Sequence, residues 1–268
     1  MTLIATAISN VGIVMASDSN LTSATSKYAG EGRKLFHVPA VGGALAVAGT
    51  YSIGAESMDQ WMPAVIDSYG FRTAPTLGGF ADYLAGHLSA EIAPDEFQHG
   101  TLVHIAAYVE ADSEAHPEFW FVRNIAKIDE TTGDYIGSDH FDVSEDFWHR
   151  DYLNPGVQRA LEFGSEQRYF NGYPPGRIAY LEFIRRFGLF LKDAWSQPTW
   201  NFRAPQTVDE LARFVDLEIR AIGAMFYSSD YSAPFIGGTV QLETIPPPSN
   251  ALKLGLGAAT ARYGQAAP

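Results

Sequence analysis

Four residues of this chain, Thr2, Asp18, Lys34 and Gly49, have types and spacing that could support covalent catalysis. Thr2 follows the initiator methionine, and cytosolic processing usually removes methionine in front of a side chain as small as threonine. The mature chain would then carry a hydroxyl and a free α-amine on its first residue. Because such an amine has a reference pKa of about 7.7–8.0, Thr2 could act both as nucleophile and as base.

The other three residues supply what a threonine nucleophile needs. Asp18 closes an apolar run, and Lys34 precedes a second strand-like run. An ammonium at Lys34 would lower the pKa of a nearby hydroxyl and amine, and Asp18 would hold it in place as a charge partner. Gly49 ends a strand of small residues, where a backbone N–H can approach a substrate oxyanion without interference from a Cβ.

Over about its first fifty residues the chain resembles the proteasome β-subunit superfamily, which includes the bacterial HslV-type peptidases. The threonine, the aspartate of Ala16-Ser-Asp-Ser19 and the lysine match that family without a gap. The Ala48-Gly49 turn matches after one inserted residue near 39–42. The resemblance implies an α+β fold, the four-layer αββα sandwich of N-terminal nucleophile (Ntn) hydrolases, and a threonine-peptidase site formed by these four residues.

The same family uses an aspartate and a serine late in the chain to orient the amine. Here Asp230 and Ser232 precede the pair Gly237-Gly238, with extra residues between. Their roles are therefore left open.

Composition restricts the partners. The formal charge of −13 disfavours binding to nucleic acid and to anionic membrane surfaces, since both attract lysine and arginine and repel carboxylates. The absence of cysteine excludes disulfides, thiolate metal sites and cysteine nucleophiles. The N-terminus lacks the basic segment and long apolar core of a signal peptide, and no run approaches transmembrane length. We therefore expect a cytoplasmic protein.

Other motifs for metal or cofactor binding lack the spacing or the surrounding elements that such sites need. The histidines include no His-Glu-x-x-His, and His99 with His104 spans a loop-to-strand junction. The glycines of 255–260 follow a proline run and open no amphipathic helix, so a dinucleotide site is not expected. The acidic segment 139–146 lacks the spacing of a calcium loop. We expect no metal and no cofactor.

The order of elements predicts a single Ntn-hydrolase-like domain over residues 1–246 and a flexible tail over 247–268. Periodicity predicts strands, two helices, strands, two helices and a last strand. The expected strands are 3–8, 11–17, 34–38, 42–48, 102–109, 118–122, 126–128 and 238–245, and the expected helices are 52–69, with a kink or break at Pro63, 77–92, one after 174–176 and one from Thr207. The segment 137–173 has no clean period and is interpreted as an insertion with short helical pieces.

Aromatic residues in that segment are interpreted either as an oligomer contact surface or as additional core. They are Phe141, Phe147, Trp148, Tyr152, Phe163, Tyr169 and Phe170.

Three functional hypotheses remain open. The first is a threonine hydrolase that cleaves peptide or amide bonds and forms a homo-oligomeric ring or stack, with or without an ATPase or other regulatory partner. The second is a subunit with the same fold that has lost turnover and serves a structural or assembly role. The third is an unrelated α+β binding or metabolic domain.

Overall fold

The chain is α+β, with antiparallel strands forming its two larger sheets. The computed structural model describes residues 2–22, 27–92, 100–111, 113–129, 135–144, 162–163, 166–172, 174–229 and 235–251. Sheet I has the order β12 (Glu162–Phe163), β13 (Glu166–Gly172), β1 (Leu3–Ser9), β2 (Gly12–Ser17) and β14 (Gln241–Ile245). Sheet II has the order β11 (Tyr135–Ser144), β10 (Glu114–Ile128), β9 (Leu102–Ala111), β6 (Gly43–Ala48) and β5 (Leu35–Val38).

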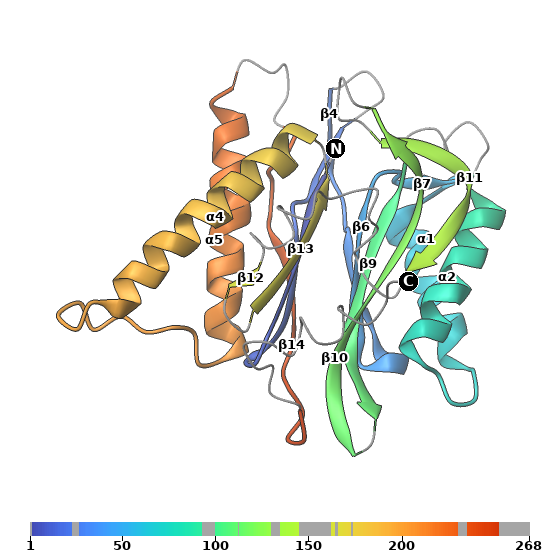
Figure 1. Ribbon diagram of the computed structural model, residues 1–268. Helices are drawn as coiled ribbons and strands as arrows, with labels where there is room; N and C mark the ends of the chain where they lie inside the picture. The colour runs from blue at the N-terminus through green and yellow to red at the C-terminus, as the bar shows by residue number, and fades with distance from the viewer. Residues whose placement is uncertain are drawn as a thin grey trace, which may run out of the picture.

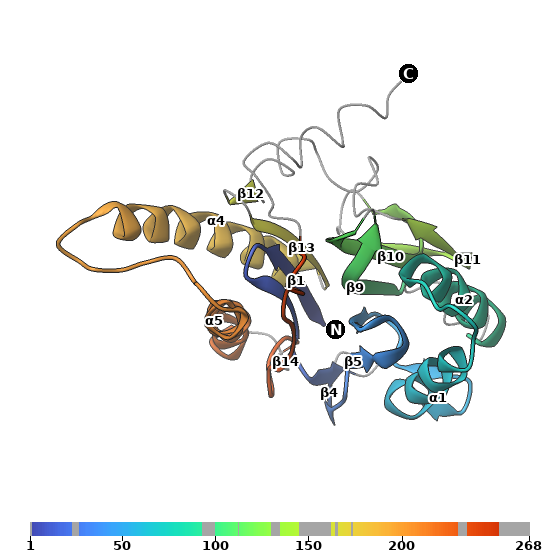
Figure 2. The same cartoon turned by 90° about the horizontal axis from the view of Figure 1, so that it is seen from below.

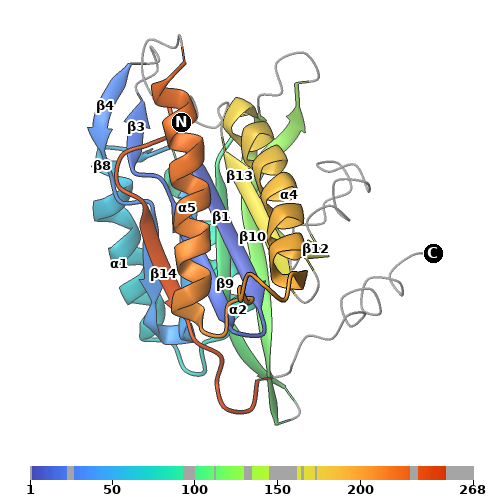
Figure 3. The ribbon, with the colours of Figure 1, turned by 90° about the vertical axis from the view of Figure 1, so that its left-hand side faces the viewer.

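Helices cover one face of each sheet (Figures 1 and 2). The helices α4 (Pro174–Ser196) and α5 (Val208–Tyr227) lie over sheet I, as Figure 3 shows from their side. The helices α1 (Met58–Gly70) and α2 (Leu77–Glu91) lie over sheet II. The short elements are β3 (Asn20–Thr22), β4 (Tyr28–Glu31), β7 (Ser52–Ile53), β8 (Glu56–Ser57) and the 3₁₀ turn η1 (Pro39–Val41). Among the described helices, none has the length and apolar character needed to cross a membrane.

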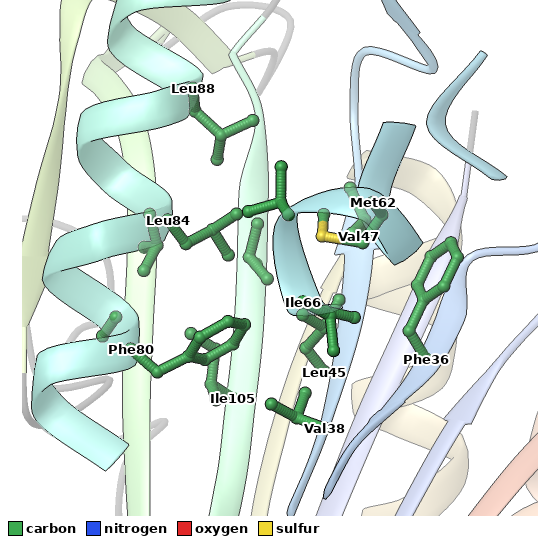
Figure 4. Close-up of a cluster of buried hydrophobic side chains, with 14 of the residues drawn as sticks. Phe36, Val38, Leu45, Val47, Met62, Ile66, Phe80, Leu84, Leu88 and Ile105 are labelled. Atoms are coloured by element: carbon green, nitrogen blue, oxygen red, sulfur yellow. The ribbon is translucent and has the colours of Figure 1, made fainter. Parts of the chain in front are cut away.

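The alternation of side chains along the strands explains why the sheets face each other. In β1, Leu3 and Ala5 belong to the cluster under α4 and α5, whereas Ile4 and Ile8 belong to the cluster between the sheets. Successive side chains of a strand point to opposite faces, so a strand buried on both faces is apolar throughout. The third cluster packs α1 and α2 onto sheet II, where Phe80, Leu84 and Leu88 point toward side chains of the neighbouring strands and helix (Figure 4).

The predicted elements appear in the predicted order, but the last strand, β14, begins at Gln241 and not at 238, and three other segments need correction. Helix α1 begins at Met58 and not at 52, because 52–57 form the small β7–β8 hairpin, and the helix continues past Pro63. The strands expected at 118–122 and 126–128 are one strand, β10, with register shifts between Arg123 and Lys127.

The segment 137–173 is the third correction, because its ends are strands of the two sheets. Residues 137–144 belong to β11, and 166–172 form β13 beside β1. Phe141, Tyr169 and Phe170 are buried in the core, so they form no contact surface. Phe147, Trp148 and Tyr152 lie outside the described residues, as does the side chain of Phe163.

The first residues of the predicted tail are in contact with the β9–β10 hairpin. The carbonyl of Asn250 accepts a hydrogen bond from the N–H of Ala115 (3.0 Å), and its side chain donates to Glu110 (3.2 Å). Residues 252–268 lie outside the described part of the chain.

Candidate active site

Thr2 lies directly before β1 and is buried, with 5% of its surface exposed. The neighbouring strands fix this end of β1 from both sides, because Leu3 is paired with Gly172 of β13 and Ile4 with Ser17 of β2. Asp18 follows β2 immediately, so the antiparallel register brings it beside the peptide that joins Thr2 to Leu3.

Asp18 is hydrogen-bonded to the start of β1 through both its backbone and its side chain. The N–H of Leu3 donates to Oδ1 of Asp18 (2.8 Å), and the N–H of Asp18 donates to the carbonyl of Leu3 (3.2 Å). The N–H of Gly237 donates to the second carboxylate oxygen, Oδ2 (3.2 Å). These contacts hold the carboxylate in one orientation.

Lys34 completes a buried ion pair on the same oxygen atom. Its ammonium Nζ lies 3.2 Å from Oδ1 of Asp18, and the two side chains are 1% and 0% exposed. Nζ also donates to the carbonyl of Asn20 (2.6 Å). Oδ1 of Asp18 therefore connects the Lys34 ammonium with the backbone nitrogen that follows Thr2.

Burial shifts both pKa values of the pair. Burial lowers the pKa of the Lys34 ammonium, and the neighbouring Asp18 charge acts in the opposite direction. Burial likewise raises the pKa of the Asp18 carboxyl, opposed first by Lys34 and then by the N–H groups of Leu3 and Gly237.

Gln241, at the start of β14, fixes the backbone around Lys34. Its side-chain oxygen accepts from the N–H groups of Lys34 (2.8 Å) and Leu35 (3.1 Å), and its amide nitrogen donates to the carbonyl of Gly32 (2.6 Å). Since β14 belongs to sheet I and β5 to sheet II, one amide links the two sheets at the lysine. The sequence did not predict this role, because Gln241 stands in an ordinary alternating strand pattern.

Gly172 was also missed, although it lies closest to Thr2 on the other side. A Cβ built on Gly172 would be 1.9 Å from the carbonyl oxygen of Thr2, and the residue has a φ of +152°. Only glycine therefore allows the end of β13 to approach the Thr2 backbone this closely. Its position inside an aperiodic segment gave no signal of this contact.

Gly49 lies at the same end of sheet II as Lys34. The N–H of Val47 donates to the carbonyl of Lys34 (2.9 Å), so Gly49 lies two residues beyond the lysine's partner. Gly49 has a φ of +117°, a conformation that favours glycine. The structure thus joins Asp18 and Lys34 by direct contact, holds Asp18 against the N–H of Leu3, the residue after Thr2, and puts Gly49 at the neighbouring strand end.

The remaining predicted residues add no further group to the site. Asp230 and Ser232 lie outside the described residues, as does His99. His104 is buried between the sheets and hydrogen-bonded to Thr6 and Asn171. In the part of the chain that the structure describes, no cluster of three or more His, Cys, Asp or Glu side chains could hold a metal ion.

The arrangement can support attack by a threonine hydroxyl on a carbonyl carbon. It has a buried threonine at the start of a strand, a cation paired with an oriented carboxylate, and a glycine turn at the neighbouring strand end. No protein-family model matches the sequence, and no curated protein matches it.

Proposed function

We propose that this protein is an N-terminal threonine hydrolase that cleaves peptide or other amide bonds, with Thr2 as nucleophile after removal of Met1. The proposal includes the fold: two facing sheets with helices on their outer faces suit the four-layer αββα sandwich of proteasome-like Ntn hydrolases. A fold alone does not determine a function, so the residues of the site must support it.

One observation carries the proposal: a buried carboxylate oxygen is shared by the Lys34 ammonium and the N–H next to Thr2. A lysine that served only as a surface charge would keep its ammonium in water. Here burial has a desolvation cost, and the shared oxygen of the pair accepts the N–H of Leu3, the residue after Thr2. A cation beside the start of this strand suits the stabilisation of a developing alkoxide.

The proposed reaction proceeds in two balanced steps. The Thr2 amine, directly or through one water, takes the hydroxyl proton while Oγ1 attacks the substrate carbonyl carbon. The tetrahedral intermediate loses its amine leaving group, which receives that proton, and an ester on Thr2 remains. Water then attacks the ester by the same proton transfers and releases the carboxylic acid, which regenerates Thr2.

Each of the other residues has a defined part in this scheme. Positive charge at Lys34 lowers the pKa of the Thr2 hydroxyl and amine, and Asp18 holds the lysine. The backbone N–H of Gly49 is assigned to the oxyanion of the intermediate. No cofactor takes part in the scheme, and we assign no nucleic-acid or membrane partner.

The proposal extends to assembly and location. A threonine nucleophile of broad specificity is hazardous in the open cytosol, so we propose a cytoplasmic homo-oligomer, a ring or stack, that encloses the Thr2 sites. Within the part of the chain that the structure describes, no feature assigns an ATPase or other regulatory partner.

The test compares Thr2→Ala and Thr2→Ser with the wild type on a panel of fluorogenic peptide and amide substrates. Alanine is also small enough for removal of Met1, so the variant changes the hydroxyl without changing the processing. We expect Thr2→Ala to lose detectable turnover and Thr2→Ser to keep part of it. Wild-type turnover in Thr2→Ala would refute the assignment.

The second candidate is a subunit with this fold and no turnover. The contacts of Asp18 and Lys34 also favour this candidate, because they connect the ends of β1, β2 and β5 and so stabilise the fold. Equal inactivity of the wild type and the Thr2 variants on the whole panel would support this candidate.

A further inference from the structure

We propose that Thr101 is a positioning residue, which acts with Asn124 to hold the Gly49–Thr50 peptide in the orientation that catalysis requires. The inference rests on the proposed function, in which the N–H of Gly49 stabilises the oxyanion. Thr101 precedes β9, and Asn124 lies within β10, so neither residue belongs to the segment that carries Gly49.

The Gly49 turn packs directly against Thr101. A Cβ built on Gly49 would be 2.6 Å from the carbonyl oxygen of Gly100 and 2.7 Å from Cα of Thr101. The N–H of Thr50 donates to Oγ1 of Thr101 (3.0 Å). This bond fixes the peptide plane that follows Gly49.

Thr101 is in turn held by a buried asparagine. Its N–H donates to Oδ1 of Asn124 (2.5 Å), and its carbonyl accepts from the N–H of Asn124 (3.2 Å). The side-chain nitrogen of Asn124 donates to the carbonyl of Ser138 in β11 (3.2 Å). Thr101 and Asn124 are each 1% exposed, so water does not compete for these hydrogen bonds.

The hydrogen bonds of Thr101 and Asn124 are needed because the proposed oxyanion donor is the backbone N–H of a glycine. Glycine has the greatest backbone freedom, and the φ of Gly49 lies in the region that other residues avoid. An oxyanion donor must point at its target with an error well below one ångström. Fixing the following peptide plane through Thr50 restricts rotation about Gly49 and so aims its N–H.

The test is the variant Thr101→Val, which has a similar shape and lacks the hydroxyl acceptor. We expect kcat for an amide substrate to fall about tenfold to a hundredfold, with KM changed by less than about threefold, because the interaction acts mainly in the transition state. Thr101→Ser keeps the hydroxyl and is expected to retain kcat within about threefold.

Thr76→Val is the matched control. Thr76 Oγ1 also accepts a backbone N–H, that of Gly79 (3.1 Å), but it does so at the start of α2. This variant loses a hydroxyl acceptor of a backbone N–H at an exposed position away from the site and should keep the wild-type kcat. If Thr101→Val does not fold, Thr101→Ala is used in its place. Alanine also lacks the hydroxyl acceptor, but its side chain is smaller than that of threonine, whereas valine has a similar shape.

Three outcomes would overturn the inference: Thr101→Val keeps the wild-type kcat, it loses no more than Thr76→Val, or Thr101→Ser fails to restore kcat. Thr2→Ala in the same assay separates this failure from that of the proposed function. Turnover that survives in Thr2→Ala, or is undetectable in the wild type, refutes the proposed function and the inference with it. Turnover that is lost in Thr2→Ala and unchanged in Thr101→Val refutes only the role of Thr101.

Discussion

At the scale of single residues, the Asp18–Lys34 pair is the feature with the largest expected effect. The pair is buried, and removal of one partner leaves the other charge without compensation. We expect Lys34→Ala to lose about 3–5 kcal/mol of unfolding free energy and nearly all turnover. Lys192→Ala, which changes an exposed lysine of α4, should match the wild type in both.

A measurement of stability separates catalysis from folding in this experiment. Denaturant titration of each variant reports the folded fraction under assay conditions. A Lys34→Ala protein that is folded and fully active would contradict the assignment of Lys34.

His104 predicts how stability changes with pH. Its Nε2 lies 2.8 Å from Oδ1 of Asn171, an acceptor, so Nε2 carries the proton, and Nδ1 accepts from Thr6 (3.0 Å). Burial lowers the pKa of His104 to about 4 from 6.5, with the Asn171 bond acting the other way. The unfolded chain therefore binds the proton more tightly between these values, and stability is lost as the pH falls through this window.

We expect this histidine to remove about 2 kcal/mol of unfolding free energy between pH 7 and pH 5. Urea titration of the wild type and His104→Gln at both pH values measures the effect, and the variant should show a smaller loss. An equal pH dependence in the wild type and His104→Gln would contradict the neutral state of His104.

At the scale of elements, a buried polar network attaches α4 and α5 to sheet I. Arg168 of β13 donates to both carboxylate oxygens of Glu218 (2.8 and 3.2 Å), and the Tyr180 hydroxyl donates to the same carboxylate (2.8 Å). These residues come from β13, α5 and α4, and none is more than 6% exposed. The network fixes the helices relative to the strand that ends at Gly172.

Glu218→Ala should therefore cost about 3–5 kcal/mol of unfolding free energy, because it leaves a buried guanidinium without its carboxylate. Asp216→Ala breaks an exposed pair with Arg220 on the same helix and should cost less than about 1 kcal/mol. Denaturant unfolding of both variants tests this difference. Similar losses of unfolding free energy in Glu218→Ala and Asp216→Ala would contradict the claim that the buried network attaches the helices.

The sequence predicted the elements with strong periodicity and missed those stabilised by tertiary partners. β1, β2, β6 and α5 follow their apolar patterns. β13 carries Arg168 and Asn171, whose partners lie 50 and 67 positions away, so no local pattern could show that these polar residues are buried.

Local sequence patterns predicted part of the candidate site, and the short range of those patterns explains why the other residues were missed. Thr2, Asp18 and Lys34 stand in short segments of recognisable type, so their spacing was informative. Gln241, Gly172 and Thr101 act through contacts made only after the sheets assemble. Nothing in their local sequence distinguishes them from ordinary strand or turn residues.

At the scale of the whole molecule, exposed apolar residues on and after α4 form the surface at which we propose that copies meet. The last turns of α4 and the segment 197–207 extend beyond sheet I (Figure 2). Leu189, Phe190, Trp200 and Phe202 are each at least 50% exposed there. Exposed apolar surface of this kind is typical of interfaces.

We expect light scattering at micromolar concentration to give the wild type a mass several times the 29.3 kDa of one chain. A charge inside an apolar interface is unfavourable, so Phe190→Glu should shift the mass toward one chain. Phe71→Glu, at a residue 90% exposed after α1, should not. A wild type with the mass of one chain would remove the assembly proposal.

We propose above all that Thr2 is the first residue of the mature chain and its nucleophile. Mass spectrometry of the intact protein, before and after treatment with a β-lactone that acylates hydroxyl nucleophiles, tests both parts, and fragmentation locates the adduct. We predict a mass without Met1 and a single acyl group on Thr2. A chain that keeps Met1, or one that loses it and is acylated elsewhere or not at all, would contradict the claim.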